Sequence, residues 1–144
     1  MGNRATTLAA GAVRAVQKYE LDYGLHYETI ELMHSVDCLL AGGRTDFVTC
    51  GNLVVGFIVG WTNDVVSSST KKAIAQFSSG RNQPFLLLIP SIEPGKPKAL
   101  VATLQNTVEN DTLMCGSSFG VIKTRDAGVF YYVVGLMKPR RSRS

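Results

Sequence analysis

The chain has 144 residues, the length of one ordinary domain, and 45% of them are hydrophobic while 18% are charged. This balance provides enough apolar surface for a packed core and excludes disorder of the whole chain. The longest apolar run, residues 53–61, is less than half of the about 20 residues that a membrane-spanning helix needs. The three cysteines form no C-x-x-C pair, so the sequence indicates no disulfide framework.

The formal net charge of +4 is concentrated at the two ends of the chain. The last seven residues, KPRRSRS, contain Lys138, Arg140, Arg141 and Arg143 and no acid. Residues 1–18 carry three more basic groups and no acid, so the body between the two ends is mildly acidic. Exposed arginines bind phosphate-rich partners, and the tail therefore predicts contact with RNA, DNA or an anionic membrane surface. The alternative is a solubilising tail without a specific partner.

The first predicted element is an amphipathic helix over residues 5–20. Leu8, Ala12 and Val16 recur at helical spacing, while Arg14 and Lys18 fall on the other face. A helix of this kind is a structural element, but the first residues also permit two targeting interpretations.

These two interpretations depend on the residues that precede the first acid, Glu20. Gly2 stands in a minimal N-myristoylation pattern, M-G-x-x-x-T, which would attach the protein to a membrane. The basic, acid-free start also resembles a mitochondrial presequence. Without either signal, the expected location is cytoplasmic.

A second helix is predicted after Glu28. Leu32, Val36 and Leu39 form its apolar stripe, and the adjacent glycines at 42 and 43 provide a C-terminal stop. The pattern then changes to strands. Residues 47–50 and 53–59 flank Gly51-Asn52, which predicts a β-hairpin.

Further elements follow in order. A short helix is expected over residues 67–80 and a buried strand over 85–89. A turn is expected over 93–97, followed by a strand over 99–104. Two further strands are expected over 120–123 and 128–137, and the loop 124–127 joins them. Both alternating sets of side chains in the last strand are apolar or aromatic, which predicts a central strand covered on both faces.

This order predicts an α+β fold with a mostly antiparallel sheet of five to six strands, two N-terminal helices and one short inserted helix. Residues 1–137 are expected to form a single compact domain. Residues 138–144 are expected to form a flexible basic tail.

One pattern that suggests catalysis is rejected on the sequence itself. Residues 116–120 match G-x-S-x-G, the nucleophile elbow of α/β-hydrolases. The elbow requires a helix after the serine, whereas residues 120–123 read as a strand. Both histidines also precede the serine, in the reverse of that family's order.

A cysteine hydrolase is the alternative that remains. Cys115 could act as a nucleophile if the imidazole of His34 or His26 lies within hydrogen-bond reach and generates the thiolate. Spacing along the chain cannot show that approach. An inert thiol at the end of a strand is the simpler interpretation.

The second predicted helix offers one candidate metal site, because Glu31, His34 and Cys38 share one of its faces. Zinc accepts all three ligand types, but no second ligand pair occurs in the sequence, so no metal is predicted. The sequence also has no Walker A motif and no G-x-G-x-x-G, and no cofactor is predicted.

The sequence therefore favours a non-enzymatic interaction or structural module. A protein partner or self-association is expected through the folded body, together with contact between the tail and an acidic partner. A compact body with a basic end would also suit a small viral or accessory protein.

Overall fold

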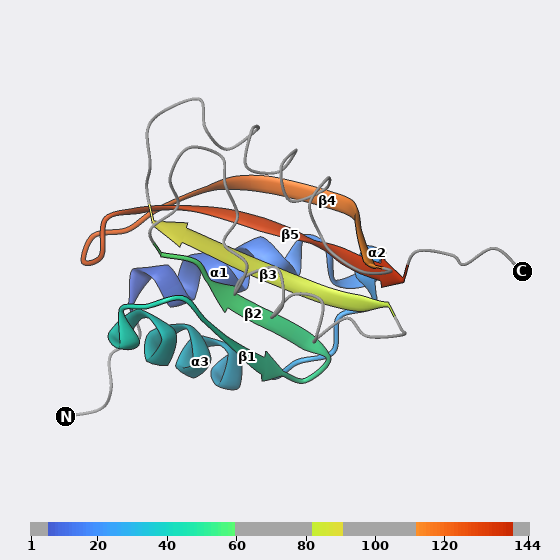
Figure 1. Ribbon diagram of the computed structural model, residues 1–144. Coiled ribbons are helices and arrows are strands. Elements are labelled where there is room, and N and C mark those ends of the chain that lie inside the picture. Colours follow the sequence, from blue (N-terminus) through green and yellow to red (C-terminus); the bar gives the residue numbers. More distant parts are fainter. Residues whose placement is uncertain (1–5, 60–81, 91–111, 140–144) are drawn as a thin grey trace, which may run out of the picture.

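The computed structural model describes residues 6–59, 82–90 and 112–139 (Figure 1). Within these ranges, three helices precede a five-stranded sheet, an α+β arrangement as predicted. The helices are α1 (Thr7–Gln17), α2 (Glu20–Tyr23) and α3 (Thr29–Gly42), and the strands are β1 (Asp46–Cys50), β2 (Leu53–Phe57), β3 (Gln83–Pro90), β4 (Thr112–Lys123) and β5 (Val129–Pro139).

Helix α1 confirms the first predicted helix over most of its length. Thr6 is the N-cap, and its hydroxyl accepts a hydrogen bond from the amide of Ala9 at 3.1 Å. Leu8, Ala12 and Val16 are fully buried. The helix ends near Lys18, and the separate four-residue helix α2 follows, which the periodicity did not predict.

Helix α3 matches the second predicted helix. Leu32, Val36 and Leu39 are buried, as their spacing indicated. Gly43 adopts a left-handed conformation with φ of 64°, and its amide donates to the carbonyls of the last turn. The residue that ends the helix is therefore one of the two glycines expected to do so.

The strands form a mixed sheet in the order β1-β2-β3-β5-β4. The predicted hairpins β1–β2 and β4–β5 are present, and β3 pairs with β5 in antiparallel fashion. Strands β2 and β3 are parallel, which requires the long crossover between them. Strand β4 begins at Thr112, well before the expected residue 120.

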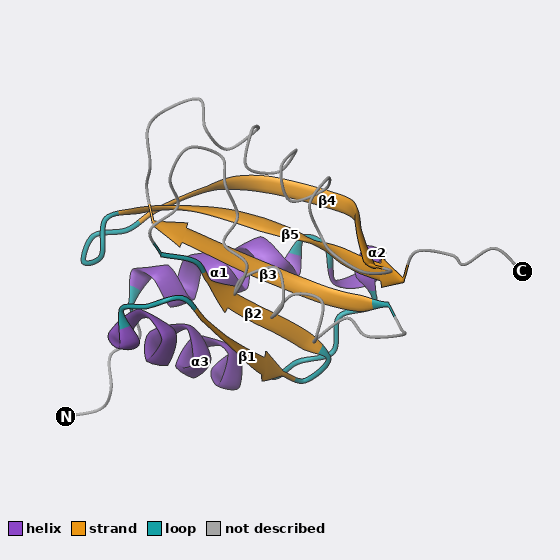
Figure 2. Cartoon of the chain, in the orientation of Figure 1, coloured by secondary structure: helices purple, strands orange, loops and turns teal. Residues whose placement is uncertain are grey.

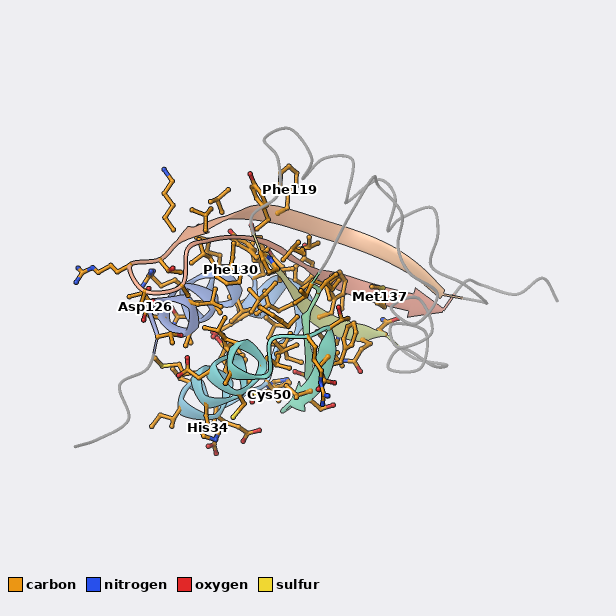
Figure 3. The ribbon with its side chains drawn as sticks, turned by 60° about the vertical axis from the view of Figure 1, so that its left-hand side comes forward. His34, Cys50, Phe119, Asp126, Phe130 and Met137 are labelled. Carbon is orange, nitrogen blue, oxygen red and sulfur yellow. The ribbon has the colours of Figure 1, made fainter. Side chains whose placement is uncertain are left out.

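Helices α1 and α3 lie on one face of the sheet (Figure 2). Helix α3 packs against β1 and β2, whereas α1 packs against β4 and β5. The core between the layers includes Leu86 of β3 and Phe130 of β5, and Figure 3 shows Phe130 among the interior side chains.

The opposite face of the central strands is buried as well. Leu87 is 1% exposed and Val133 is 1% exposed, although the alternation directs both away from α1 and α3. This confirms the prediction that the middle of β5 is covered on both faces. Towards the hairpin end, Val129 is partly exposed.

Several predicted segments lie outside the described residues. These are the helix over 67–80 with Ala73, Ile74 and Phe77, the turn over 93–97, the strand over 99–104, the N-terminal Gly2, and the tail residues Arg140, Arg141 and Arg143. Among the described helices, none has the length and apolar character required to cross a membrane.

Candidate functional site

A basic groove runs between α1 and the edge strand β4. Its cavity of about 150 Å³ is lined by Gly11, Arg14, Ala15, Lys18, Val121, Ile122, Lys123 and Tyr132. Three of these side chains are cationic and none is acidic. We refer to these eight residues as the basic groove.

The close approach of α1 to β4 depends on Gly11. A Cβ atom at this position would lie 2.4 Å from Cγ2 of Ile122, so a side chain here would require Ile122 or the helix to shift. The resulting contact lets Arg14, Lys18 and Lys123 line one groove, although more than 100 residues separate Lys18 from Lys123 along the chain.

Arg14 and Lys18 are four positions apart at the end of α1, so they are neighbours on one helix face. Both are exposed, as is Lys123 at the end of β4. Positive charge is also favoured in the last turn of a helix by the helix dipole. The groove therefore concentrates cations without placing any of them in the interior.

Tyr132 forms part of the groove wall from β5. Its ring occupies space beside Gly120, where a Cβ atom would lie 2.6 Å from the tyrosine hydroxyl oxygen. Burial, with a smaller contribution from Tyr19, raises the pKa of Tyr132 above its usual value. The hydroxyl is therefore neutral at physiological pH and can donate a hydrogen bond.

The acid nearest in sequence to Lys123 is held by the start of α1. Asp126, in the β4–β5 loop, accepts hydrogen bonds from the hydroxyl of Thr7 at 2.6 Å and from its amide at 3.4 Å (Figure 3). These hydrogen bonds lower the pKa of Asp126. The carboxylate thus has a defined partner outside the basic groove.

The first two residues of the predicted tail, Lys138 and Pro139, belong to strand β5 of the sheet. Strand β5 continues to Pro139, and the backbone of Lys138 pairs with that of Leu113 in β4. The three arginines of the tail lie beyond the described residues, so tail contact with an acidic partner stays a prediction.

The backbone of Cys115, the candidate nucleophile, shows where this residue lies in the sheet. Cys115 lies in β4 and pairs with Leu136, and residues 116–120 continue the same strand, so the G-x-S-x-G match has no strand–turn–helix context. His34 lies on α3, which packs at the other end of the strand order. The side chain of Cys115 is outside the described part, and its reactivity stays a prediction.

The thiol–imidazole pair in the described part involves a different cysteine. Sγ of Cys38 lies 3.6 Å from Nε2 of His34, and both side chains are exposed on α3. Their spacing predicts that both residues lie on one helix face, whereas the catalytic candidate predicted from the sequence joined Cys115 to His34 or His26. The four-residue spacing between His34 and Cys38 is the sequence feature that indicates the contact between them.

Glu31 is an exposed residue near the start of α3. It hydrogen-bonds the thiol of Cys50, which is fully buried. Burial first, and then the charge of Glu31, raise the pKa of Cys50 to about 11. Cys50 is therefore protonated and unreactive at neutral pH.

A second concave region, of about 590 Å³, lies at the junction of α2, α3 and the β1–β2 turn. It is lined by Glu20, Leu25, His26, Tyr27, Glu28, Glu31 and Gly51. The Tyr27 hydroxyl donates a hydrogen bond to Glu20, and burial raises the pKa of Tyr27. Two of its three acids, Glu20 and Glu31, have hydrogen-bond partners, so it is a weaker candidate than the basic groove.

Within the described ranges, no three His, Cys, Asp or Glu side chains gather as a metal site. No protein-family model, curated protein or solved structure matches this chain. The candidate site is therefore defined by its own geometry. The sequence indicated Arg14 and Lys18 as part of a basic end and of the polar face of the first helix, but it did not single out Lys123.

Proposed function

We propose that this protein is an interaction module that binds a nucleic-acid strand, with the basic groove and the C-terminal tail as its contacts. One observation carries the proposal: three cationic residues from sequence-distant segments line one groove, and none of its described lining residues is acidic. Phosphate groups are the matching ligands, because arginine offers a planar fork and lysine a compact positive charge.

The size of the groove argues against a whole small molecule as its ligand. Drug-sized ligands occupy pockets of roughly 300–1,000 Å³, whereas the groove measures about 150 Å³. This volume suits a single phosphate group that belongs to a larger partner. Arg14 and Lys18, as helix neighbours, offer two adjacent contacts along such a backbone.

The shape of the site favours a strand over a bilayer. A membrane surface is planar and cannot follow a groove between a helix and a strand edge. Single-stranded RNA or DNA is flexible enough to follow such a groove with its phosphates. We therefore favour single-stranded RNA or DNA.

The tail adds to this interaction without defining it. Lys138, Arg140, Arg141 and Arg143 can contact further phosphates by charge alone. Binding through so few cations is expected to be moderate in affinity and strongly dependent on salt.

Two variants with the same loss of charge test the groove. Arg14→Gln removes a groove cation, whereas Arg44→Gln removes an exposed cation before β1, at the opposite edge of the sheet. The binding of a fluorescent single-stranded RNA is measured over a range of salt concentrations. Arg14→Gln should reduce the slope of log affinity against log salt by about 0.7, the contribution of one phosphate contact, and Arg44→Gln should leave it unchanged.

Equal effects of the two variants would contradict the groove as the contact. The tail is tested separately by changing its four basic residues to glutamine, which preserves the length of β5. Anionic and neutral vesicles are titrated in parallel. Binding to anionic vesicles without binding to RNA would overturn the choice of a nucleic-acid partner.

A further inference from the structure

The exposed face of α3 carries a thiol and an imidazole in direct contact. His34 and Cys38 are one helical turn apart, and Sγ of Cys38 lies 3.6 Å from Nε2 of His34. Figure 3 shows His34 on the outer side of α3, away from the sheet. Neither residue belongs to the basic groove, which α1, β4 and β5 line.

The separation of the two atoms equals the spacing that a tetrahedral zinc ion imposes on its ligands. With a Zn–S bond of about 2.3 Å, a Zn–N bond of about 2.05 Å and a tetrahedral angle, the sulfur and nitrogen stand about 3.6 Å apart. The observed distance is 3.6 Å, so an ion could bind both atoms without a change of the helix.

We propose that His34 and Cys38 form a two-residue chelate for Zn²⁺ or a chemically similar divalent ion. Thiolate and imidazole are the ligands that this class of metal prefers. In the metal-free protein the sulfur and the nitrogen are within hydrogen-bond distance of each other, and the ion would lie between them.

The nearby acids do not complete the coordination shell. Glu31 hydrogen-bonds the thiol of Cys50. Asp37 accepts hydrogen bonds from the amide and hydroxyl of Thr6. The described residues thus supply two ligands, and water fills the two remaining positions on this exposed surface. Such a site is open and exchangeable, unlike a closed structural zinc site.

Binding displaces one proton and changes no oxidation state. Cys38 coordinates as a thiolate, so its thiol proton passes to solvent, while neutral His34 coordinates through Nε2 and keeps its proton on Nδ1.

Cadmium tests the chelate directly, since its bond to a thiolate gives an ultraviolet charge-transfer band. The metal-free full-length protein is titrated with Cd²⁺, and Zn²⁺ is then added in competition. We expect a saturable band that Zn²⁺ removes. His34→Gln and Cys38→Ser should each weaken binding by more than about tenfold, since loss of even an outer-shell partner can cost that much.

The chain offers a matched control for each ligand. His26→Gln and Cys115→Ser remove the other histidine and another cysteine and should leave the titration unchanged. Circular dichroism verifies that each variant is folded. Retention of the full band in Cys38→Ser, its loss in Cys115→Ser, or unchanged affinity in His34→Gln would overturn the proposal.

Discussion

Gly51, the first of the two residues between β1 and β2, cannot carry a side chain, for two independent reasons. The backbone has φ of 60°, where residues other than glycine are strained, and a Cβ atom would lie 1.9 Å from the carbonyl oxygen of His26. The neighbouring Asn52 explains the close approach. Its amide donates to the His26 carbonyl at 2.9 Å, and its side-chain oxygen accepts from the His26 amide at 2.7 Å.

Gly51→Ala should lower the free energy of unfolding by about 3 kcal/mol, because the clash is with backbone that the Asn52 hydrogen bonds hold in place. Gly42→Ala is the matched control. No atom lies within 4 Å of a Cβ at Gly42, which is helical, and the change should stabilise the protein by about 0.5–1 kcal/mol. Urea unfolding measures both. Similar effects would contradict this account of the turn.

At the scale of elements, the β4–β5 loop is joined to the start of α1 through Thr7. The Thr7 hydroxyl donates to Asp126 at 2.6 Å and accepts from the amide of Arg125 at 3.0 Å. A carboxylate at this position also meets the positive end of the helix dipole. The sequence predicted both elements, but 118 residues separate Arg125 from Thr7, so no local pattern could indicate their contact.

This contact predicts a pH dependence with a definite sign. The pKa of Asp126 is lowered in the folded state by the Thr7 hydrogen bonds, so its stabilisation is present above the ordinary value of 3.8 and is lost as pH falls through the lower folded value. Asp126→Asn should be less stable than the wild type at pH 7, and the difference should shrink in acid below about pH 4.

Urea unfolding at a series of pH values measures the difference, with Asp22→Asn as the control. Asp22 is exposed on α2. A difference between Asp126→Asn and the wild type that stays constant into strong acid would exclude the carboxylate as its cause.

At the scale of the whole molecule, the sheet is buried on both faces at its centre. Leu86 and Leu87 are consecutive residues of β3 that point to opposite faces, and they are 0% and 1% exposed. A sheet with helices on one side only would leave one of them in contact with water.

Leu86→Ala and Leu87→Ala should therefore destabilise the protein to a similar extent, by about 2–5 kcal/mol each. The free energies of unfolding are compared under identical conditions, with Val121→Ala as an exposed β4 control that should have little effect. A nearly neutral Leu87→Ala would show that the second face is not packed in solution.

The sequence by itself determined the elements whose signals are local. Apolar spacing predicted α1 and α3, glycine at 43 ended α3, and the turn chemistry of Gly51-Asn52 predicted the first hairpin. It missed α2, which is only four residues long and has no buried side chain, and the early start of β4.

Only the tertiary structure decided how these elements meet. The parallel pairing of β2 with β3 and the strand order depend on contacts between distant segments, which residue spacing does not encode. The basic groove has the same origin, because Gly11 lets α1 approach β4 and thereby brings Arg14 and Lys18 to Lys123. Local periodicity reports which face of an element is apolar, whereas packing selects the partner of that face.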